Sequence, residues 1–143
     1  MDVREWSFRQ STAYYKCLNE EYILISDKFT VDDGYRMGKE LLKKESLPTA
    51  LCIASDTLAV GVLQALNEGG IQVPEQIALF SINDVNIAKY LSPPLTTIHI
   101  DIPCICETAL DLLRTRVLSG GRVTKLVFVC LLYTSDAADE ARS

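Results

Sequence analysis

Residues 49–68 read TALCIASDTLAVGVLQALNE, and this stretch decides the fold class. Thr49 to Ala54 is apolar on both sides, which is typical of a parallel strand covered by helices. Ser55-Asp56 fits a helix N-cap, and Gly69-Gly70 fits a helix end. Between them, apolar residues recur at the spacing of one helix face, at Ala59, Val62, Leu63 and Leu66. A buried strand followed directly by an amphipathic helix is the repeating unit of an α/β sheet.

The same alternation extends in both directions from this unit. The pattern predicts strands at 21–26, 49–54, 77–82, 96–100 and 123–132. It predicts helices at 3–18, 31–44, 57–68, 85–90 and 102–118. Strands that alternate with helices of this length predict a doubly wound α/β fold with a parallel sheet.

Polar residues follow three of the predicted strands, as Ser26–Phe29, Ser55-Asp56 and Asn83-Asp84. Ligands of such sheets bind beyond the carboxyl ends of the strands. Carboxylates, amides and hydroxyls beside an aromatic ring suit a polyhydroxylated ligand, because each polar group can bridge sugar hydroxyls while the ring covers the apolar face. The last two pairs also precede helices, so N-capping is an alternative role. One residue of each pair can cap while the other faces a cleft.

The composition excludes several classes of protein. The chain has 143 residues, 48% hydrophobic and 23% charged, with a net charge of −5, which indicates a globular domain whose surface does not favour nucleic acid or anionic lipid. Five scattered cysteines predict reduced, mostly buried thiols rather than a disulfide framework. Cys104 and Cys106 form an isolated pair and His99 is the single histidine, so no metal site is expected.

Targeting and catalytic motifs are not found either. No apolar run approaches the ~20 residues of a membrane span, and the first residues do not resemble a signal peptide. The sequence contains no G-x-S-x-G, no phosphate-binding glycine loop and no H-E-x-x-H, and one histidine does not easily build a catalytic triad. We therefore expect neither an enzyme nor a bound cofactor.

Several motifs resemble a known family. Ala54–Gly61 (ASDTLAVG), Ala65–Glu75 (ALNEGGIQVPE) and Pro93–Ile98 (PPLTTI) are similar to the sensor domain of lac/gal repressor-type regulators. Phe29–Tyr35 (FTVDDGY) is most similar to the branch that contains the evolved β-galactosidase repressor. The similarity covers residues 2–129. It departs from the family at Ser81–Asp84 (SIND), where glycine-aromatic-Asp-Asp is commoner, and at Ile100.

The resemblance implies a periplasmic-binding-protein-like fold of type I, with two α/β lobes around a ligand cleft. It implies a cytoplasmic homodimer or tetramer without membrane contact, which binds operator DNA only through a helix-turn-helix outside these residues. A sugar effector would shift the lobes and thereby the affinity for DNA. Residues 1–100 would be part of the C-terminal lobe without its first strand. Residues 101–129 would be the crossover segment of the N-terminal lobe and a final strand. Residues 130–143 resemble a translated sequencing adapter and would be a non-native tail.

The family pattern also implies roles for individual residues. The residues that match effector-binding positions are Arg4, Phe29, Ser55, Asn83 and Ile100. Asp56 and Asp84 would then be the helix caps at the cleft, and Tyr90 and Leu91 would lie where subunits meet. The leading hypothesis is the sugar-binding sensor of a transcription repressor that controls sugar or galactoside genes. The alternatives are a periplasmic sugar-binding protein of a transporter, which a signal peptide upstream would favour, and a sugar-processing enzyme.

Overall fold

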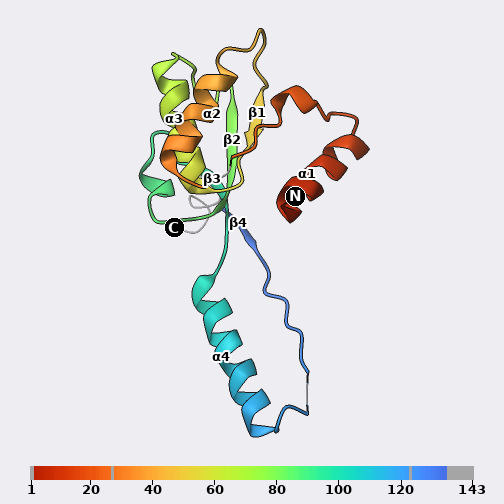
Figure 1. Cartoon of the computed structure of the whole chain (residues 1–143). Helices are drawn as coiled ribbons and strands as arrows, with labels where there is room; N and C mark the ends of the chain where they lie inside the picture. The colour runs from red at the N-terminus through yellow and green to blue at the C-terminus, as the bar shows by residue number, and fades with distance from the viewer. Residues whose placement is uncertain (1, 27, 123, 135–143) are drawn as a thin grey trace.

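The computed structural model describes residues 2–26, 28–122 and 124–134 (Figure 1). The elements in chain order are α1 (Val3–Tyr14), η1 (Glu20–Tyr22), α2 (Val31–Leu41), β1 (Ala50–Cys52), α3 (Asp56–Glu68), β2 (Ala78–Asn83), η2 (Ala88–Tyr90), β3 (Thr96–His99), α4 (Ile102–Leu118) and β4 (Leu132–Thr134). Here η denotes a short 3₁₀ helix.

The strands form one sheet in the order β1-β2-β3-β4. The first three strands are parallel, with Ala50 opposite Ala78 and Asn83 opposite His99. β4 pairs with β3 in the antiparallel direction. The predicted α/β class with a parallel sheet is confirmed, and the carboxyl ends of β1, β2 and β3 point to the same edge.

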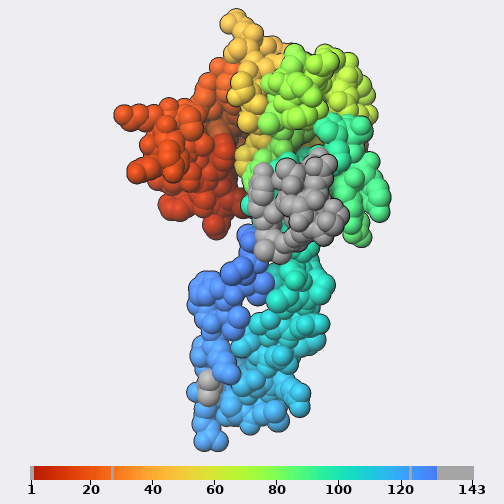
Figure 2. Space-filling view, turned by 180° about the vertical axis from the view of Figure 1, so that it is seen from behind, coloured from red at the N-terminus to blue at the C-terminus, as the bar shows by residue number. Residues whose placement is uncertain are grey.

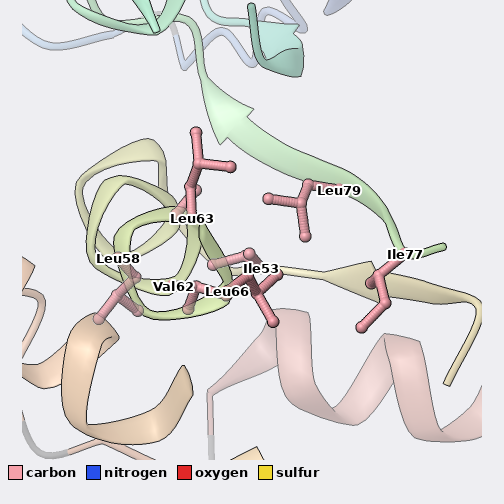
Figure 3. Close-up of a cluster of buried hydrophobic side chains, with 8 residues drawn as sticks. Ile53, Leu58, Val62, Leu63, Leu66, Ile77 and Leu79 are labelled. Atoms are coloured by element: carbon pink, nitrogen blue, oxygen red, sulfur yellow. The ribbon is translucent and has the colours of Figure 1, made fainter. Parts of the chain in front are cut away.

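The hydrophobic core lies between α3 and the sheet. Figure 3 shows Leu58, Val62, Leu63 and Leu66 of α3 gathered against Leu79 of β2 and against Ile53 and Ile77, which directly follow β1 and precede β2, respectively. These α3 residues are at most 6% exposed. Each fully buried side chain of this size contributes about 1.5–3 kcal/mol to folding, so this cluster fixes α3 on the sheet.

Helices α2 and α3 pack with their backbones in contact. A Cβ atom on Gly34 would lie 2.1 Å from the carbonyl oxygen of Leu58, and one on Gly61 would lie 2.0 Å from that of Val31. Both distances are far below a van der Waals contact. Only glycine therefore allows the two helices to lie this close, and the start of α2 is held against the start of α3.

Glu68 adds a polar contact at the other end of this helix pair. The Lys39 ammonium lies 2.8 Å from the Glu68 carboxylate, the Tyr35 hydroxyl donates to it at 2.7 Å, and the Gln64 amide donates at 3.2 Å. These contacts lower the pKa of Glu68 from its ordinary value of 4.5 to about 2. The carboxylate is therefore stabilised in the folded state relative to the unfolded chain.

This shift predicts a pH-dependent effect of Glu68→Gln. A carboxyl whose pKa is depressed on folding stabilises the fold above its unfolded pKa, and the stabilisation is lost as the pH falls towards its folded pKa. We expect Glu68→Gln to lower the melting temperature slightly at pH 7, because the group is exposed and screened. The difference from wild type should shrink between pH 4.5 and about pH 2. Glu75→Gln, on an exposed turn before β2, is the control; an equal, pH-independent effect of both variants would contradict the prediction.

Helix α4 projects away from the sheet as an arm, and residues 124–131 run back along it (Figures 1 and 2). None of its residues is buried. Its exposed apolar side chains are Ile102, Ile105, Leu110, Leu113, Val117 and Leu118.

The strand predicted at 21–26 is wrong. Glu20–Tyr22 forms a 3₁₀ turn and the residues after it are not in a strand. A strand needs a neighbour to pair with its backbone N–H and C=O groups. This segment does not pair with β1 in that way. Residues of both line a cavity of about 370 Å³. The local pattern is strand-like, but pairing decides whether a strand forms.

Other boundaries also differ from the predictions. The strand predicted at 123–132 is wrong for residues 124–131, which are in no strand, and β4 covers Leu132–Thr134 instead. The helix predicted at 85–90 is reduced to the short 3₁₀ helix η2. Helices α1 and α2 end three or four residues early. The predicted thiol burial is wrong, since Cys17, Cys52, Cys106 and Cys130 are exposed and Cys104 is half-buried. Most of the predicted non-native tail, 135–143, lies outside the described residues.

Candidate functional site

Arg4 and Phe29 meet at the carboxyl end of β1. The Arg4 Nη1 atom donates to the Ala54 carbonyl at 2.7 Å, immediately before Ser55. Its guanidinium carbon lies 5.1 Å from the centre of the Phe29 ring, a distance at which cation and ring attract. The structure therefore brings together two residues that are 25 positions apart in the sequence and that were predicted to share one site.

Asp2 orients the Arg4 side chain. Its carboxylate accepts hydrogen bonds from Arg4 Nε at 3.0 Å and from Nη2 at 2.8 Å, and also from the Arg4 backbone amide. These bonds lower the pKa of Asp2 to about 2. A guanidinium has five N–H donors, of which Asp2 and Ala54 take three, so two further donors remain for a ligand.

The cavity beside this pair extends over the amino-terminal half of the chain. Arg4, Phe29, Ala54 and Ile82 are among the residues that line its 370 Å³. Ser55, Asn83 and Ile100 do not line it. Ser55 and Asn83 directly follow the lining residues Ala54 and Ile82, and Ile100 directly follows β3, so all three lie at the carboxyl ends of neighbouring strands.

Ser55, rather than Asp56, caps α3. Ser55 has an extended backbone, and its hydroxyl accepts from the Leu58 amide at 3.4 Å. Asp56 is already the first helical residue. The predicted capping role of Asp56 is therefore wrong, because a residue with helical backbone angles does not occupy the cap position.

The Asp56 carboxylate instead forms a buried polar network that was not predicted from the sequence. The residue is 0% exposed and accepts hydrogen bonds from Ser81 Oγ, from Thr97 Oγ1 at 2.7 Å and from the Val85 amide at 2.8 Å. One signal was present in the sequence. Ser81 is the one polar residue in the apolar stretch Ile77–Ile82, and a buried hydroxyl needs a partner.

Asn83 is the last residue of β2, and the chain leaves the strand through Asp84 and Val85; we call residues 83–85 the turn. The φ angles of Asn83 and Asp84 are +123° and +54°, values that non-glycine residues seldom adopt. The Asp84 carboxylate lies 2.8 Å from His99 Nδ1. The predicted capping role of Asp84 is wrong, because no helix begins directly after it: the next helix, η2, starts only at Ala88 and has no side-chain cap.

The residues predicted at a subunit contact differ in exposure. Tyr90 is 79% exposed, whereas Leu91 is half-buried and packs against the hydrophobic core. Tyr90 is accessible to a second subunit, and its role there stays a prediction.

Neither a metal cluster nor a membrane-spanning helix is found in the described part of the chain. Across residues 2–26, 28–122 and 124–134, no three His, Cys, Asp or Glu side chains gather in a way that could hold a metal ion. None of the helices in these ranges combines the length and apolar character needed to span a bilayer.

The parallel strands β1 to β3, with polar groups at their carboxyl ends, have the arrangement in which α/β domains bind ligands. A family model described as a periplasmic binding protein-like domain matches residues 1–132. The chain belongs to this family, in the group that contains transcriptional regulators of the lac/gal repressor type.

Two relatives illustrate this membership. The chain is 44% identical over 131 residues to the HTH-type transcriptional regulator GanR of Bacillus subtilis (strain 168), covering 90% of this chain and 40% of GanR. It is 40% identical over 96 residues to the lactose operon repressor of Rhizobium radiobacter, covering 67% of this chain and 84% of that sequence. The chain thus spans less than half the length of GanR.

Solved structures show the same fold. A LacI family regulator from Lactobacillus casei with bound sucrose superposes with a TM-score of 0.77 at 24% identity, covering 92% of this chain and 49% of that one. A LacI family regulator from Enterococcus faecium with bound ribose also gives 0.77 at 24% identity, covering 90% and 47%. The predicted periplasmic-binding-protein-like fold is confirmed.

Proposed function

We propose that this chain is the sugar-sensing part of a bacterial transcription repressor that controls sugar or galactoside genes. The observation that carries the proposal is the Arg4–Phe29 pair at the carboxyl end of β1. A guanidinium with two remaining donors can bind ring hydroxyls, and an aromatic ring can cover the apolar face of the sugar. The membership in a family of regulators supports the same conclusion.

The proposal also implies how the chain is placed in the whole regulator and how that regulator binds DNA. Residues 1–100 would form part of the C-terminal lobe, and residues 101–129 would cross to the N-terminal lobe. Operator DNA would be bound by a separate helix-turn-helix, because this chain has a net charge of −5. The protein would act in the cytoplasm as a homodimer or tetramer, with Tyr90 at a subunit contact. It would bind its effector without converting it.

Effector-dependent release of operator DNA tests the proposal. The full-length regulator that carries this domain should bind its operator, and lactose, D-galactose or a β-galactoside disaccharide should release it, because the sugar favours one arrangement of the lobes. Sucrose and D-ribose serve as comparison sugars. Binding of sugar by calorimetry and release of DNA by fluorescence anisotropy are the measurements. A protein that binds none of these sugars, or hydrolyses one of them, contradicts the proposal.

A matched pair of variants connects this response to the site. Phe29→Ala removes the ring and should weaken sugar binding about tenfold, the value of roughly 1.4 kcal/mol for one aromatic contact. Phe29→Tyr keeps the ring and should bind sugar within about threefold of wild type. Equal affinities of the two variants would remove Phe29 from the site.

A further inference from the structure

We infer that Asp56 is a positioning residue for the sugar site, because it holds the turn of Asn83, Asp84 and Val85 in the shape that presents Asn83. The sugar-binding part of this inference rests on the proposed function. Asp56 does not line the cavity. It acts through the backbone of the turn.

The carboxylate joins three separate parts of the chain. It belongs to the first turn of α3, and its Oδ1 atom accepts from Ser81 Oγ of β2 and from Thr97 Oγ1 of β3. Its Oδ2 atom accepts from the Val85 amide in the segment after β2. The Ser81 and Thr97 partners are directly opposite each other in the parallel pairing of β2 with β3. One buried group therefore sets the relative position of a helix start, two strands and a turn.

The turn needs such support because of its backbone. Asn83 and Asp84 both have positive φ angles, which persist in non-glycine residues only where the surrounding contacts impose them. Three contacts do so here. The Val85 amide donates to Asp56 Oδ2 at 2.8 Å, the Asp84 amide donates to Thr97 Oγ1 at 3.3 Å, and the Asp84 carboxylate lies 2.8 Å from His99 Nδ1. Two of these three contacts involve the Asp56–Thr97 pair.

Asp56 is needed neither to cap α3 nor to hold that helix on the sheet. Ser55 caps α3, and the core residues Leu58 to Leu66 fix that helix on the sheet. An apolar residue could fill the space of a buried side chain, but it could not accept the Val85 amide. Asp56 is needed as the acceptor of the Val85 amide and of the Ser81 and Thr97 hydroxyls, and the first of these bonds acts directly on the turn.

Substitutions of Thr97 and Asp56 in the full-length regulator test the inference. Thr97→Val keeps the shape of the side chain and removes the hydroxyl, whereas Thr97→Ser keeps the hydroxyl. Asp56→Asn replaces one acceptor oxygen by a donor. Ile77→Ala is the control, because Ile77 is 1% exposed and directly precedes β2, at the end away from the turn, so its loss lowers stability without touching the turn.

Two measurements separate positioning from stability. Amide hydrogen exchange, followed by mass spectrometry on a peptide covering residues 83–90, reports the turn without any ligand. Calorimetry with lactose and D-galactose reports the site. In Thr97→Val and Asp56→Asn, we expect the amide hydrogens of this peptide to exchange at least about tenfold faster than in wild type. We expect both variants to bind the sugars about tenfold more weakly. Thr97→Ser should resemble wild type, and Ile77→Ala should melt at a lower temperature with unchanged affinity.

The outcomes are distinguishable. If Thr97→Val and Ile77→Ala change exchange and affinity equally, Asp56 has no positioning role and the inference is overturned. If Asp56→Asn does not fold, the comparison of Thr97→Val with Thr97→Ser decides. If wild type binds neither sugar, the proposed function fails while the exchange measurement still decides whether the Asp56 network holds the turn.

Discussion

Replacing Gly61 by alanine is expected to destabilise the domain by about 3 kcal/mol or more, the upper part of the range for overpacked cores. The new Cβ atom would lie 2.0 Å from the Val31 carbonyl oxygen and 2.5 Å from the Tyr35 amide nitrogen. Both neighbours are backbone atoms of α2, so no side-chain rotation relieves the overlap. The helices must separate, and the packing between them is lost. Urea unfolding of the full-length regulator, with slopes compared as well as midpoints, measures the loss.

Gly70 provides the control for this substitution. It has a φ of +75°, and a Cβ atom added to it would meet nothing within 4 Å, so Gly70→Ala adds only the cost of a left-handed backbone, about 1 kcal/mol. Gly34→Ala should behave like Gly61→Ala, because its Cβ would lie 2.1 Å from the Leu58 carbonyl oxygen. Similar midpoints for Gly61→Ala and Gly70→Ala would show that α2 and α3 are not packed backbone to backbone.

Replacing Arg4 by alanine should abolish the response to sugar while leaving operator binding intact. A hydrogen bond from a charged donor contributes about 1.5–3 kcal/mol, so loss of the guanidinium should weaken sugar binding tenfold to more than a hundredfold. The substitution also removes the contacts to Ala54 and Phe29 that hold the strand end and the ring together. Sugar titrations of the regulator on operator DNA measure both affinities.

Arg9 is a matched control on the same helix. Its guanidinium pairs with Glu5 at 2.8 Å and with Glu20, and it does not line the cavity. Arg9→Ala should respond to sugar like wild type. Arg4→Lys keeps the charge but loses the planar fork, so an intermediate affinity is expected. Unchanged induction by Arg4→Ala would remove Arg4 from the site.

The elements that the sequence predicted well are those whose signal is local. The apolar spacing from Ala59 to Leu66 defines α3 without reference to the rest of the chain. The segment 21–26 has an equally good strand composition, but its backbone has no strand beside it among the described residues. Pairing is a property of the assembled sheet, so composition alone could not decide it.

In the candidate site, too, some features could be predicted from the sequence and others depend on the assembled fold. Ser55 and Asn83 could be placed at strand ends because the order of strands and helices determines which ends meet. The capping roles could not be assigned, since Ser55 and Asp56 both suit a helix start and only backbone angles separate them. The network of Asp56 was missed because its hydroxyl partners are 25 and 41 residues away in the sequence.

The close contact between α2 and α3 limits how far the residues before the two helices can move apart. Phe29 lies two residues before α2 and Ser55 directly before α3, and the two helices are in backbone contact at Gly34 and Gly61. The distance between these two positions is therefore set by the backbone packing of α2 against α3. A change of sugar preference by engineering should therefore exchange side chains at the strand ends and leave Gly34 and Gly61 unchanged.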